Sequence, residues 1–160
     1  MLIIFTLSCT SKQRNDSIKY KRTNRTTSVL SNSKYTMNIP IGSKLINLVG
    51  GHNEIEKQFV YSDSSKLYIS DFECSMLNYK NILSLGDSIA LKRFEGVEIK
   101  AKIAKELNQK FKPETITLQG KTVNGFWKDI RIGYICVGYV NVPENHKKKF
   151  DEALGSLKKK

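Results

Sequence analysis

The dipeptide Asn124-Gly125 restricts the fold of this 160-residue chain more than any other feature of its sequence. Both central positions of a type I′ β-turn need positive φ, which asparagine and glycine adopt at little cost. Strand-forming segments lie on both sides of the dipeptide, so we predict a β-hairpin around it. The predicted strands in this part of the chain cover residues 115–118, 126–132 and 134–142, with Gly133 at a bend.

The N-terminal half of the chain predicts a second group of strands. Residues 35–39 alternate apolar and polar side chains and end at Pro40, and short turn clusters separate the segments that follow. The further predicted strands are residues 45–49, 54–61 and 67–72. Four strands joined by short turns favour an antiparallel meander.

Two amphipathic segments predict helices. In the middle of the chain, apolar residues recur at helical spacing between Glu98 and Pro113, and they are Ile99, Ile103, Ala104, Leu107 and Phe111. At the C-terminus, Pro143 fits the first helical position and Glu144 complements the helix dipole. The apolar stripe of this second helix consists of Phe150, Ala153, Leu154 and Leu157.

The predicted fold class is therefore α+β, with a mostly antiparallel sheet of about six or seven strands, an amphipathic middle helix and a C-terminal helix packed on the sheet. Two parts of the chain resemble the PsbP-like fold. They are the opening pattern Tyr35-x-Met37-x-Ile39-Pro40-x-Gly42 and the passage from the last strand into Phe150, Leu154, Ser156 and Leu157. This resemblance implies a noncatalytic accessory or binding role.

Cys9 follows an apolar run over residues 2–8 and precedes a polar stretch. The ending Leu7-Ser8-Cys9 resembles the lipobox of bacterial lipoproteins, in the looser form found in Bacteroidota. The resemblance implies a signal peptide over residues 1–8, a lipid such as palmitate on Cys9, and a cell-envelope protein anchored to a membrane and facing the periplasm or cell exterior. The apolar run is short and no Lys or Arg precedes it, so we expect the true start to lie upstream of Met1. The alternatives are an ordinary signal peptide and a buried N-terminal strand that contains Cys9.

Residues 9–33 are predicted to form a flexible basic tether, because they are rich in Ser, Thr, Asn, Lys and Arg and poor in apolar side chains. A single domain would then cover residues 34–160. The formal net charge is +12, with further lysines concentrated at 147–149 and 158–160. In an exported protein this charge favours anionic lipid headgroups over nucleic acid as a partner. A basic nucleic-acid-binding protein remains the alternative if Cys9 plays no part.

Cys74 and Cys136 each lie in an apolar, strand-like context. Two such cysteines can pair in an oxidising compartment, but most buried cysteines act as small hydrophobic side chains. The unpaired arrangement is the favoured interpretation, because the sequence does not show whether the two strands are neighbours.

The segment Gly86-Asp87-Ser88-Ile89 resembles the block that carries the nucleophile of GDSL hydrolases. In that family a later Asp-x-x-His supplies the acid and the base, but neither His52 nor His146 has an aspartate three positions before it. Ser88 therefore lacks a base at the required spacing, and a turn or helix cap is the favoured interpretation. A small serine hydrolase that uses Ser88 is kept as an alternative function.

His52, Glu54 and Glu56 alternate along a predicted strand and would share one of its faces. One histidine and two carboxylates are ligand types that metals accept, yet a row of solvated polar side chains gives the same pattern. We therefore predict neither a metal site nor a cofactor.

Aromatic and basic side chains interleave after the Asn124-Gly125 turn, where they form the predicted binding surface. They are Phe126, Trp127, Lys128, Arg131, Tyr134 and Tyr139. Such side chains stack on, and form ion pairs with, sugars, peptides or nucleic acids, although a strand with one core face and one solvent face produces the same pattern. Together with the Cys9 segment, this surface makes a noncatalytic cell-envelope lipoprotein that binds a protein or small-molecule ligand the leading hypothesis.

Overall fold

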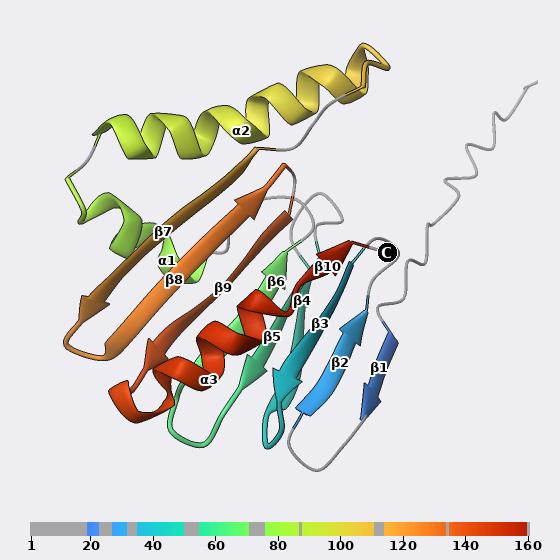
Figure 1. The fold of residues 1–160 in the computed structure, drawn as a ribbon. Helices are drawn as coiled ribbons and strands as arrows, with labels where there is room; N and C mark the ends of the chain where they lie inside the picture. Colours follow the sequence, from blue (N-terminus) through green and yellow to red (C-terminus); the bar gives the residue numbers. More distant parts are fainter. Residues whose placement is uncertain are drawn as a thin grey trace, which may run out of the picture.

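The structure, a computed structural model, describes residues 19–22, 27–31, 35–49, 55–70, 76–86, 88–110, 114–133 and 135–159. Within these ranges the chain forms two antiparallel sheets and three helices (Figure 1). The strands are β1 (Lys19–Arg22), β2 (Thr27–Ser31), β3 (Tyr35–Pro40), β4 (Lys44–Val49), β5 (Ile55–Val60), β6 (Lys66–Ser70), β7 (Thr115–Thr122), β8 (Gly125–Ile132), β9 (Ile135–Val142) and β10 (Lys158–Lys159). The helices are α1 (Met76–Leu83), α2 (Ser88–Glu106) and α3 (Glu144–Gly155).

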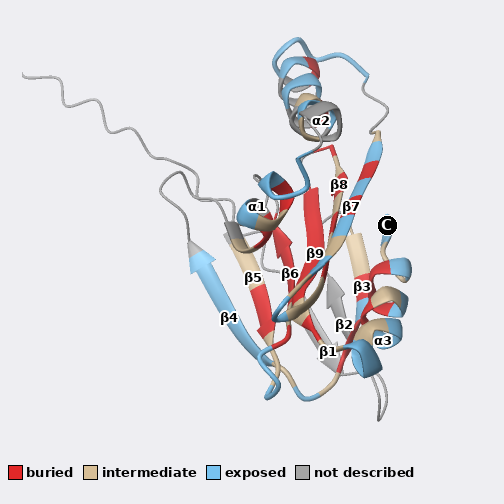
Figure 2. Cartoon of the chain, turned by 90° about the vertical axis from the view of Figure 1, so that its left-hand side faces the viewer, coloured by how far each residue is buried: buried red, intermediate tan, exposed pale blue. Residues whose placement is uncertain are grey.

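The predicted α+β class is confirmed. The larger sheet has six strands in the order β4-β5-β6-β9-β8-β7, and every neighbouring pair in it is antiparallel. A hairpin forms at the predicted place, but with a different turn. Thr122 pairs with Gly125, so Val123 and Asn124 form the turn, and of the predicted pair only Gly125 has positive φ, at 126°. Helices lie on both faces of this sheet (Figure 2). We call the side covered by α3 the α3 face, and the side against which α1 and α2 lie the α1 face.

A second sheet, in the order β1-β2-β3-β10, differs from the prediction in two ways. Strand β3 does not join the meander of β4, β5 and β6, because the chain turns at Gly42 with φ of 93° and crosses to the other sheet. Strands β1 and β2 fall inside the segment 9–33 that the composition assigns to a flexible tether. The composition prediction misses them because β2 pairs along the full length of β3, and such backbone hydrogen bonds need few apolar side chains.

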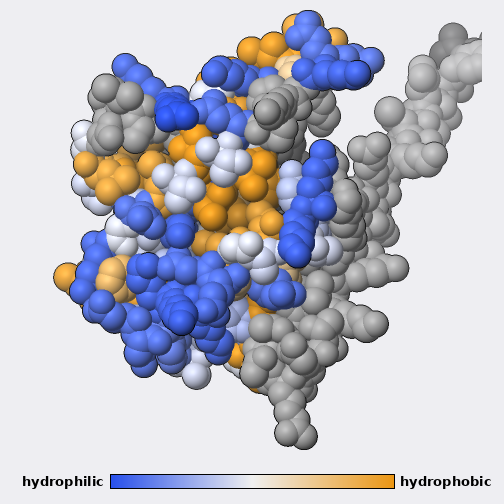
Figure 3. Space-filling view, in the orientation of Figure 1, coloured by the Kyte–Doolittle hydropathy of each residue, from blue (hydrophilic) through white to orange (hydrophobic). Residues whose placement is uncertain are grey.

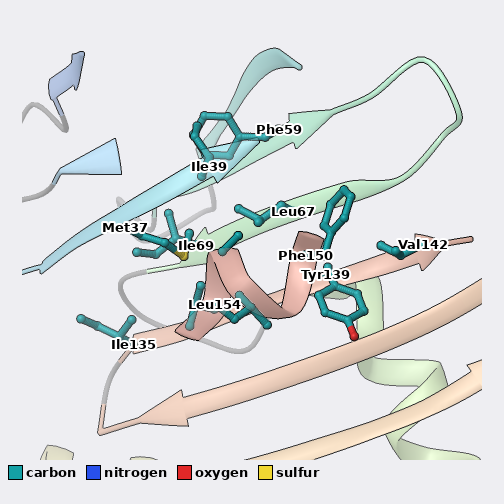
Figure 4. Packing of buried hydrophobic residues seen from close by; sticks show 12 residues of the cluster. Met37, Ile39, Phe59, Leu67, Ile69, Ile135, Tyr139, Val142, Phe150 and Leu154 are labelled. Atoms are coloured by element: carbon teal, nitrogen blue, oxygen red, sulfur yellow. The ribbon is translucent and has the colours of Figure 1, made fainter. Parts of the chain in front are cut away.

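The apolar core on the α3 face joins the two sheets through α3 (Figure 4). Phe150 is 2% exposed, and its ring meets those of Tyr61 and Tyr139 edge to face, with centroid distances of 5.1 Å and 5.7 Å. Met37 and Ile39 of β3 belong to the same cluster as Leu154. The predicted C-terminal stripe therefore packs on the sheet, with Phe150, Ala153 and Leu154 buried and Leu157 partly buried.

Helix α2 is longer than predicted, and the side of the helix that faces the sheet is not the predicted one. It begins at Ser88, ten positions before Glu98. Ile99, Ile103 and Leu107, which were expected to face the sheet, are 57%, 49% and 60% exposed, whereas Val97 and Ala104 are 1% and 8% exposed. Val97 belongs to the cluster that Ile116 and Leu118 of β7 form with Trp127 on the α1 face. Phe111 lies outside the described residues.

No helix in the described ranges is both long enough and apolar enough to cross a bilayer.

Truncation of the α3 contact should destabilise the domain. Phe150→Ala and Leu154→Ala each remove a buried side chain, which typically lowers the free energy of unfolding by about 2–5 kcal/mol. For a chain of this length each kcal/mol corresponds to roughly 2–4 °C in melting temperature. Thermal and urea denaturation measure both quantities. Lys159→Ala is the control, because Lys159 is exposed, and it should leave stability unchanged. Neutral effects of both core substitutions would show that α3 is not docked.

Candidate functional site

The six residues of the predicted binding surface do not share one exposed surface. Phe126 and Tyr139 belong to the apolar cluster on the α3 face, and Lys128 forms an ion pair with α3 on that side. Trp127 and Arg131 are each 2% exposed, and Trp127 lies in the cluster on the α1 face. Tyr134 lies outside the described residues.

Alternation along β8 separates Phe126 and Lys128 from Trp127 and Arg131, and a β-bulge lies beside them. Between the pairs Phe126↔Val142 and Lys128↔Tyr139, strand β9 has one more residue than β8. Asn141 of β9 has φ of 58°, the left-handed conformation that such irregularities often contain. Val142 thereby returns to the α3 face together with Tyr139, while Trp127 packs with Val140 on the α1 face. Simple alternation along β9 does not predict the face of Val142.

On the α3 face, Asp151 connects α3 to the sheet. Its carboxylate accepts from Lys128 Nζ at 2.9 Å, Lys147 Nζ at 2.6 Å and the Tyr139 hydroxyl at 3.1 Å. Burial raises the pKa of Asp151, but the hydrogen bonds from Lys147, Lys128 and Tyr139, together with the charge of Lys128, outweigh it and hold the pKa below 3.8. Burial, and then the charge of Asp151, raise the pKa of Tyr139. The carboxylate of Asp151 therefore has a structural role, because it connects α3 to β8 and β9.

The outer surface of α3 carries a shallow depression of about 540 Å³ lined only by charged residues, namely Glu144, Lys147, Lys148, Asp151 and Glu152. Nearby, Lys121 Nζ and Lys147 Nζ lie 4.9 Å and 5.8 Å from the centre of the Phe126 ring, a cation–π arrangement. Small-molecule sites are usually enclosed and lined mainly by hydrophobic and aromatic residues, whereas this depression is open and lined by charged residues.

A buried polar cluster lies on the α1 face, between the sheet and α1. The Tyr68 hydroxyl donates to Asp129 Oδ2 at 2.7 Å, and the Cys136 thiol donates to Asp129 Oδ1 at 3.0 Å. From α1, Asn78 Nδ2 donates to the Tyr68 oxygen at 2.6 Å and to the Tyr139 carbonyl at 3.1 Å. These four side chains are fully buried, each at 0% exposure. The cluster therefore fastens α1 to three strands of the sheet.

Gly138 explains how Tyr68 reaches Asp129. Gly138 of β9 pairs with Tyr68 of β6 on one side and with Asp129 of β8 on the other. A Cβ atom at Gly138 would collide with the Tyr68 hydroxyl and with the backbone carbonyl of Lys128. The absence of a side chain lets the tyrosine cross β9, so glycine is required here by close packing.

Electrostatics at Asp129 are dominated by burial, which raises the pKa of this carboxyl above 3.8. Hydrogen bonds from Cys136 and Tyr68, and the positive charge of the buried Arg131, lower the pKa by less. A raised pKa at a charged group in a cleft is a common mark of catalysis, but structural networks produce it as well. The complete burial of Asp129 favours the structural interpretation.

His146 and Asp63 form the one Asp–His pair among the described residues, with Nδ1 2.8 Å from Oδ2. The pair joins the first turn of α3 to the turn between β5 and β6. A hydrogen bond from the Ser65 amide at 3.0 Å also holds Asp63. Burial raises the pKa of Asp63, yet the hydrogen bonds from Ser65 and His146 and the charge of His146 keep it below 3.8.

The predicted nucleophile block is not brought to this pair. Ser88 is the first residue of α2, which lies at the end of the molecule opposite the turn that contains Asp63 (Figure 1). Asp87 lies outside the described residues, as do His52 and Glu54 of the row considered for a metal. Glu56 lies on β5 and is partly exposed. Within the described ranges no three His, Cys, Asp or Glu side chains are grouped so that they could hold a metal ion.

Cys136 is the hydrogen-bond donor described above, whereas Cys74 lies outside the described residues. The expectation that the two cysteines are unpaired therefore stays a prediction.

Apolar side chains are exposed on β4, an edge strand of the larger sheet. Leu45, Ile46 and Leu48 are 40%, 37% and 44% exposed. Leu45 lies opposite Phe59 and so points to the α3 face, while Ile46 lies opposite Gln58 and points to the α1 face. An apolar edge of this kind is suited to strand addition by another polypeptide.

No protein-family model, curated protein or solved structure matches this chain.

Sequence reasoning missed the polar cluster, although one signal for it exists. Asp129 lies two positions from Trp127 and two from Arg131, and so shares a strand face with them. With Trp127 in the core, the charged pair on the same face must also be buried. The sequence does not reveal that Trp127 faces the core.

Replacement of Asp129 should change how stability depends on pH. Because its pKa is raised in the folded protein, Asp129 keeps its proton to higher pH in the folded than in the unfolded chain, and stability falls as pH rises from 3.8 through the raised pKa. Asp129→Asn removes this ionisation, so its free energy of unfolding should fall less than that of the wild type as pH rises from about 4 toward 8.

Urea denaturation across that pH range measures the difference, and Asp151→Asn is the matched control of opposite sign. The pKa of Asp151 is lowered, so Asp151 contributes stability that is present above 3.8 and lost as pH falls through the folded pKa. Asp151→Asn should therefore lower the free energy of unfolding more at neutral pH than at acidic pH. Equal pH dependence in the wild type and in Asp129→Asn would contradict the account of Asp129.

Proposed function

We propose that this chain is a lipid-anchored protein of the cell envelope whose α+β domain binds a partner and performs no catalysis. The observation that carries the proposal is the segment Leu7-Ser8-Cys9, which follows an apolar run and precedes a polar stretch. In lipoproteins of the kind it resembles, a peptidase cuts before the cysteine and the thiol carries the lipid. The resemblance of the domain's edges to the PsbP-like fold supports a binding role.

The burial of the polar cluster supports binding rather than catalysis. A catalytic group must touch its substrate, and general acid–base catalysis needs hydrogen-bond reach to the reacting atom. Asp129, Cys136 and Tyr68 are 0% exposed and satisfy one another. Their hydrogen bonds hold α1 in place, which is a structural role.

The outer edge of β4 is the binding surface that we propose. Its exposed leucine and isoleucine side chains project from both faces of the sheet, so an added strand would cover apolar surface on both sides. A second copy of this chain would bring another +12 charge, and like charges oppose association. We therefore propose an extended segment of an acidic partner protein as the occupant. Exposed Lys44 at the start of β4 favours such a segment.

Substitution of Cys9 tests the anchor. Cys9→Ser should shift the protein from the membrane fraction to the soluble fraction, because serine offers no thiol for the lipid. Mass spectrometry of the wild type should find acyl groups on a chain that begins at Cys9. Ser8→Ala is the matched control, since it keeps a small residue before the cysteine and should leave lipidation intact. An unmodified soluble wild-type chain that retains residues 1–8 would end the proposal.

A photoreactive residue in place of Ile46 tests the β4 edge in cells. It should cross-link one acidic protein, and the additional change Leu48→Glu, which removes an apolar contact and repels an acidic segment, should reduce this product about tenfold, the equivalent of about 1.4 kcal/mol in binding. The same residue in place of Val123, which is fully exposed in the β7–β8 turn, is the matched control and should give no such product. A homodimer, or equal products from both positions, would contradict the proposed occupant.

A further inference from the structure

The outer face of α2 exposes a row of apolar side chains. Ile99, Ile103 and Leu107 are spaced four residues apart and so lie on one side of the helix and the turn that follows it, at 57%, 49% and 60% exposure. The opposite side of α2 is in contact with the sheet through Val97 and Ala104. The three side chains of this row therefore take no part in the core. An apolar row on the surface is explained if it contacts another molecule.

Basic side chains accompany this row. Lys92 lies seven positions before Ile99, on the same side of α2, and Lys100 and Lys110 are exposed nearby. Helix α2 has three acidic residues, Glu95, Glu98 and the exposed Glu106, against five basic ones, Lys92, Arg93, Lys100, Lys102 and Lys105. Glu114, which precedes β7, is bound by Arg93 at 2.6 Å. Figure 3 shows apolar and hydrophilic side chains side by side at the upper end, where α2 lies. An apolar row flanked by lysine is the pattern of helices that lie at a membrane surface.

The first described strand has its starting end turned toward the side of the molecule where α2 lies. Strand β7 begins beside α2, and β1 runs in the same direction as β7, although β1 itself lies in the lower part of the view (Figure 1). Lys159 pairs with Tyr35, the first residue of β3, so the exposed Lys158 and Lys159 lie toward that side as well. The starting end of β1 and the exposed positive charge of β10 therefore both face this side of the molecule.

The length of chain between Cys9 and β1 limits how far the domain can move from its anchor. Ten residue steps, from position 9 to position 19, span roughly 35 Å at full extension. The longest strands have 8 residues and so measure about 27 Å. The stretch from Cys9 to β1 can therefore extend farther than the length of one of these strands, which a joint contact of the lipid and of α2 with one surface requires.

We infer that the outer face of α2 docks on the anionic membrane to which Cys9 is attached. This inference rests on the proposed function for the tether, and on Ile99, Ile103 and Leu107 with their neighbouring lysines for the contact. Three apolar side chains give weak binding by themselves. A short tether makes the second contact intramolecular, which raises its effective concentration to the millimolar range and makes a weak contact sufficient.

The test places a photoreactive residue at position 103 of the full chain. The chain carries Cys9→Ser and an N-terminal histidine tag, and nickel-chelating lipid holds it on vesicles of phosphatidylcholine with phosphatidylglycerol. Illumination should produce lipid adducts at position 103, at least about tenfold more than with the same residue at position 123 in the distal turn. The adducts should decrease when phosphatidylglycerol is omitted or salt is raised. Ile99→Glu should also reduce them, because it places a charge in the apolar row.

Each result decides the question. Equal lipid adducts at positions 103 and 123, or protein adducts alone at position 103, would overturn the membrane contact. Because the tag replaces the lipid, this result does not depend on modification of Cys9. A failure of the anchor would appear separately, as an unmodified Cys9 in the wild-type chain.

Discussion

The contact of α3 with both sheets is the interaction on which the rest of the fold depends. Phe150 and Leu154 meet Met37 and Ile39 of the smaller sheet and Leu67, Ile69 and Tyr139 of the larger one in a single cluster. Because β3 leaves the meander at Gly42, the cluster is a main link between the sheets. Asp151 adds polar contacts from α3 to β8 and β9, which fix the position of the helix along the sheet.

The opposite face of the larger sheet is held by a different kind of interaction. There, Asn78 of α1 joins Tyr68 and Asp129 in a cluster that the missing side chain of Gly138 makes possible. Buried polar groups cost free energy unless they are paired, and a hydrogen bond to a charged group contributes about 1.5–3 kcal/mol. Such a cluster is also geometrically demanding, so it sets one position for α1. The polar groups of this cluster are buried and hydrogen-bonded to one another. Exposed surfaces are therefore the better candidates for a functional site.

Sequence patterns predicted the local features of the fold and missed those set by long-range contacts. The hairpin between β7 and β8 and the stripe from Phe150 to Leu154 were predictable because turn-forming residues and helical period are local signals. The turn itself lies one position earlier than predicted, at Val123 and Asn124. The bulge at Asn141 reverses the face of Val142, and only pairing with β8 produces it. Likewise, α2 buries Val97 instead of Ile99, because small side chains allow close approach to β7; periodicity alone favours the larger apolar stripe.

An anchored domain with its α2 side toward the bilayer is the central claim of this account. It joins the Cys9 segment, the short connection to β1 and the exposed row on α2 in one arrangement. The most direct measurement is energy transfer from lipid-bound fluorophores to acceptors at residues 103 and 123 of the lipidated protein on vesicles. We expect residue 103 to lie nearer the bilayer than residue 123. Equal distances, or residue 123 nearer the bilayer, would contradict it.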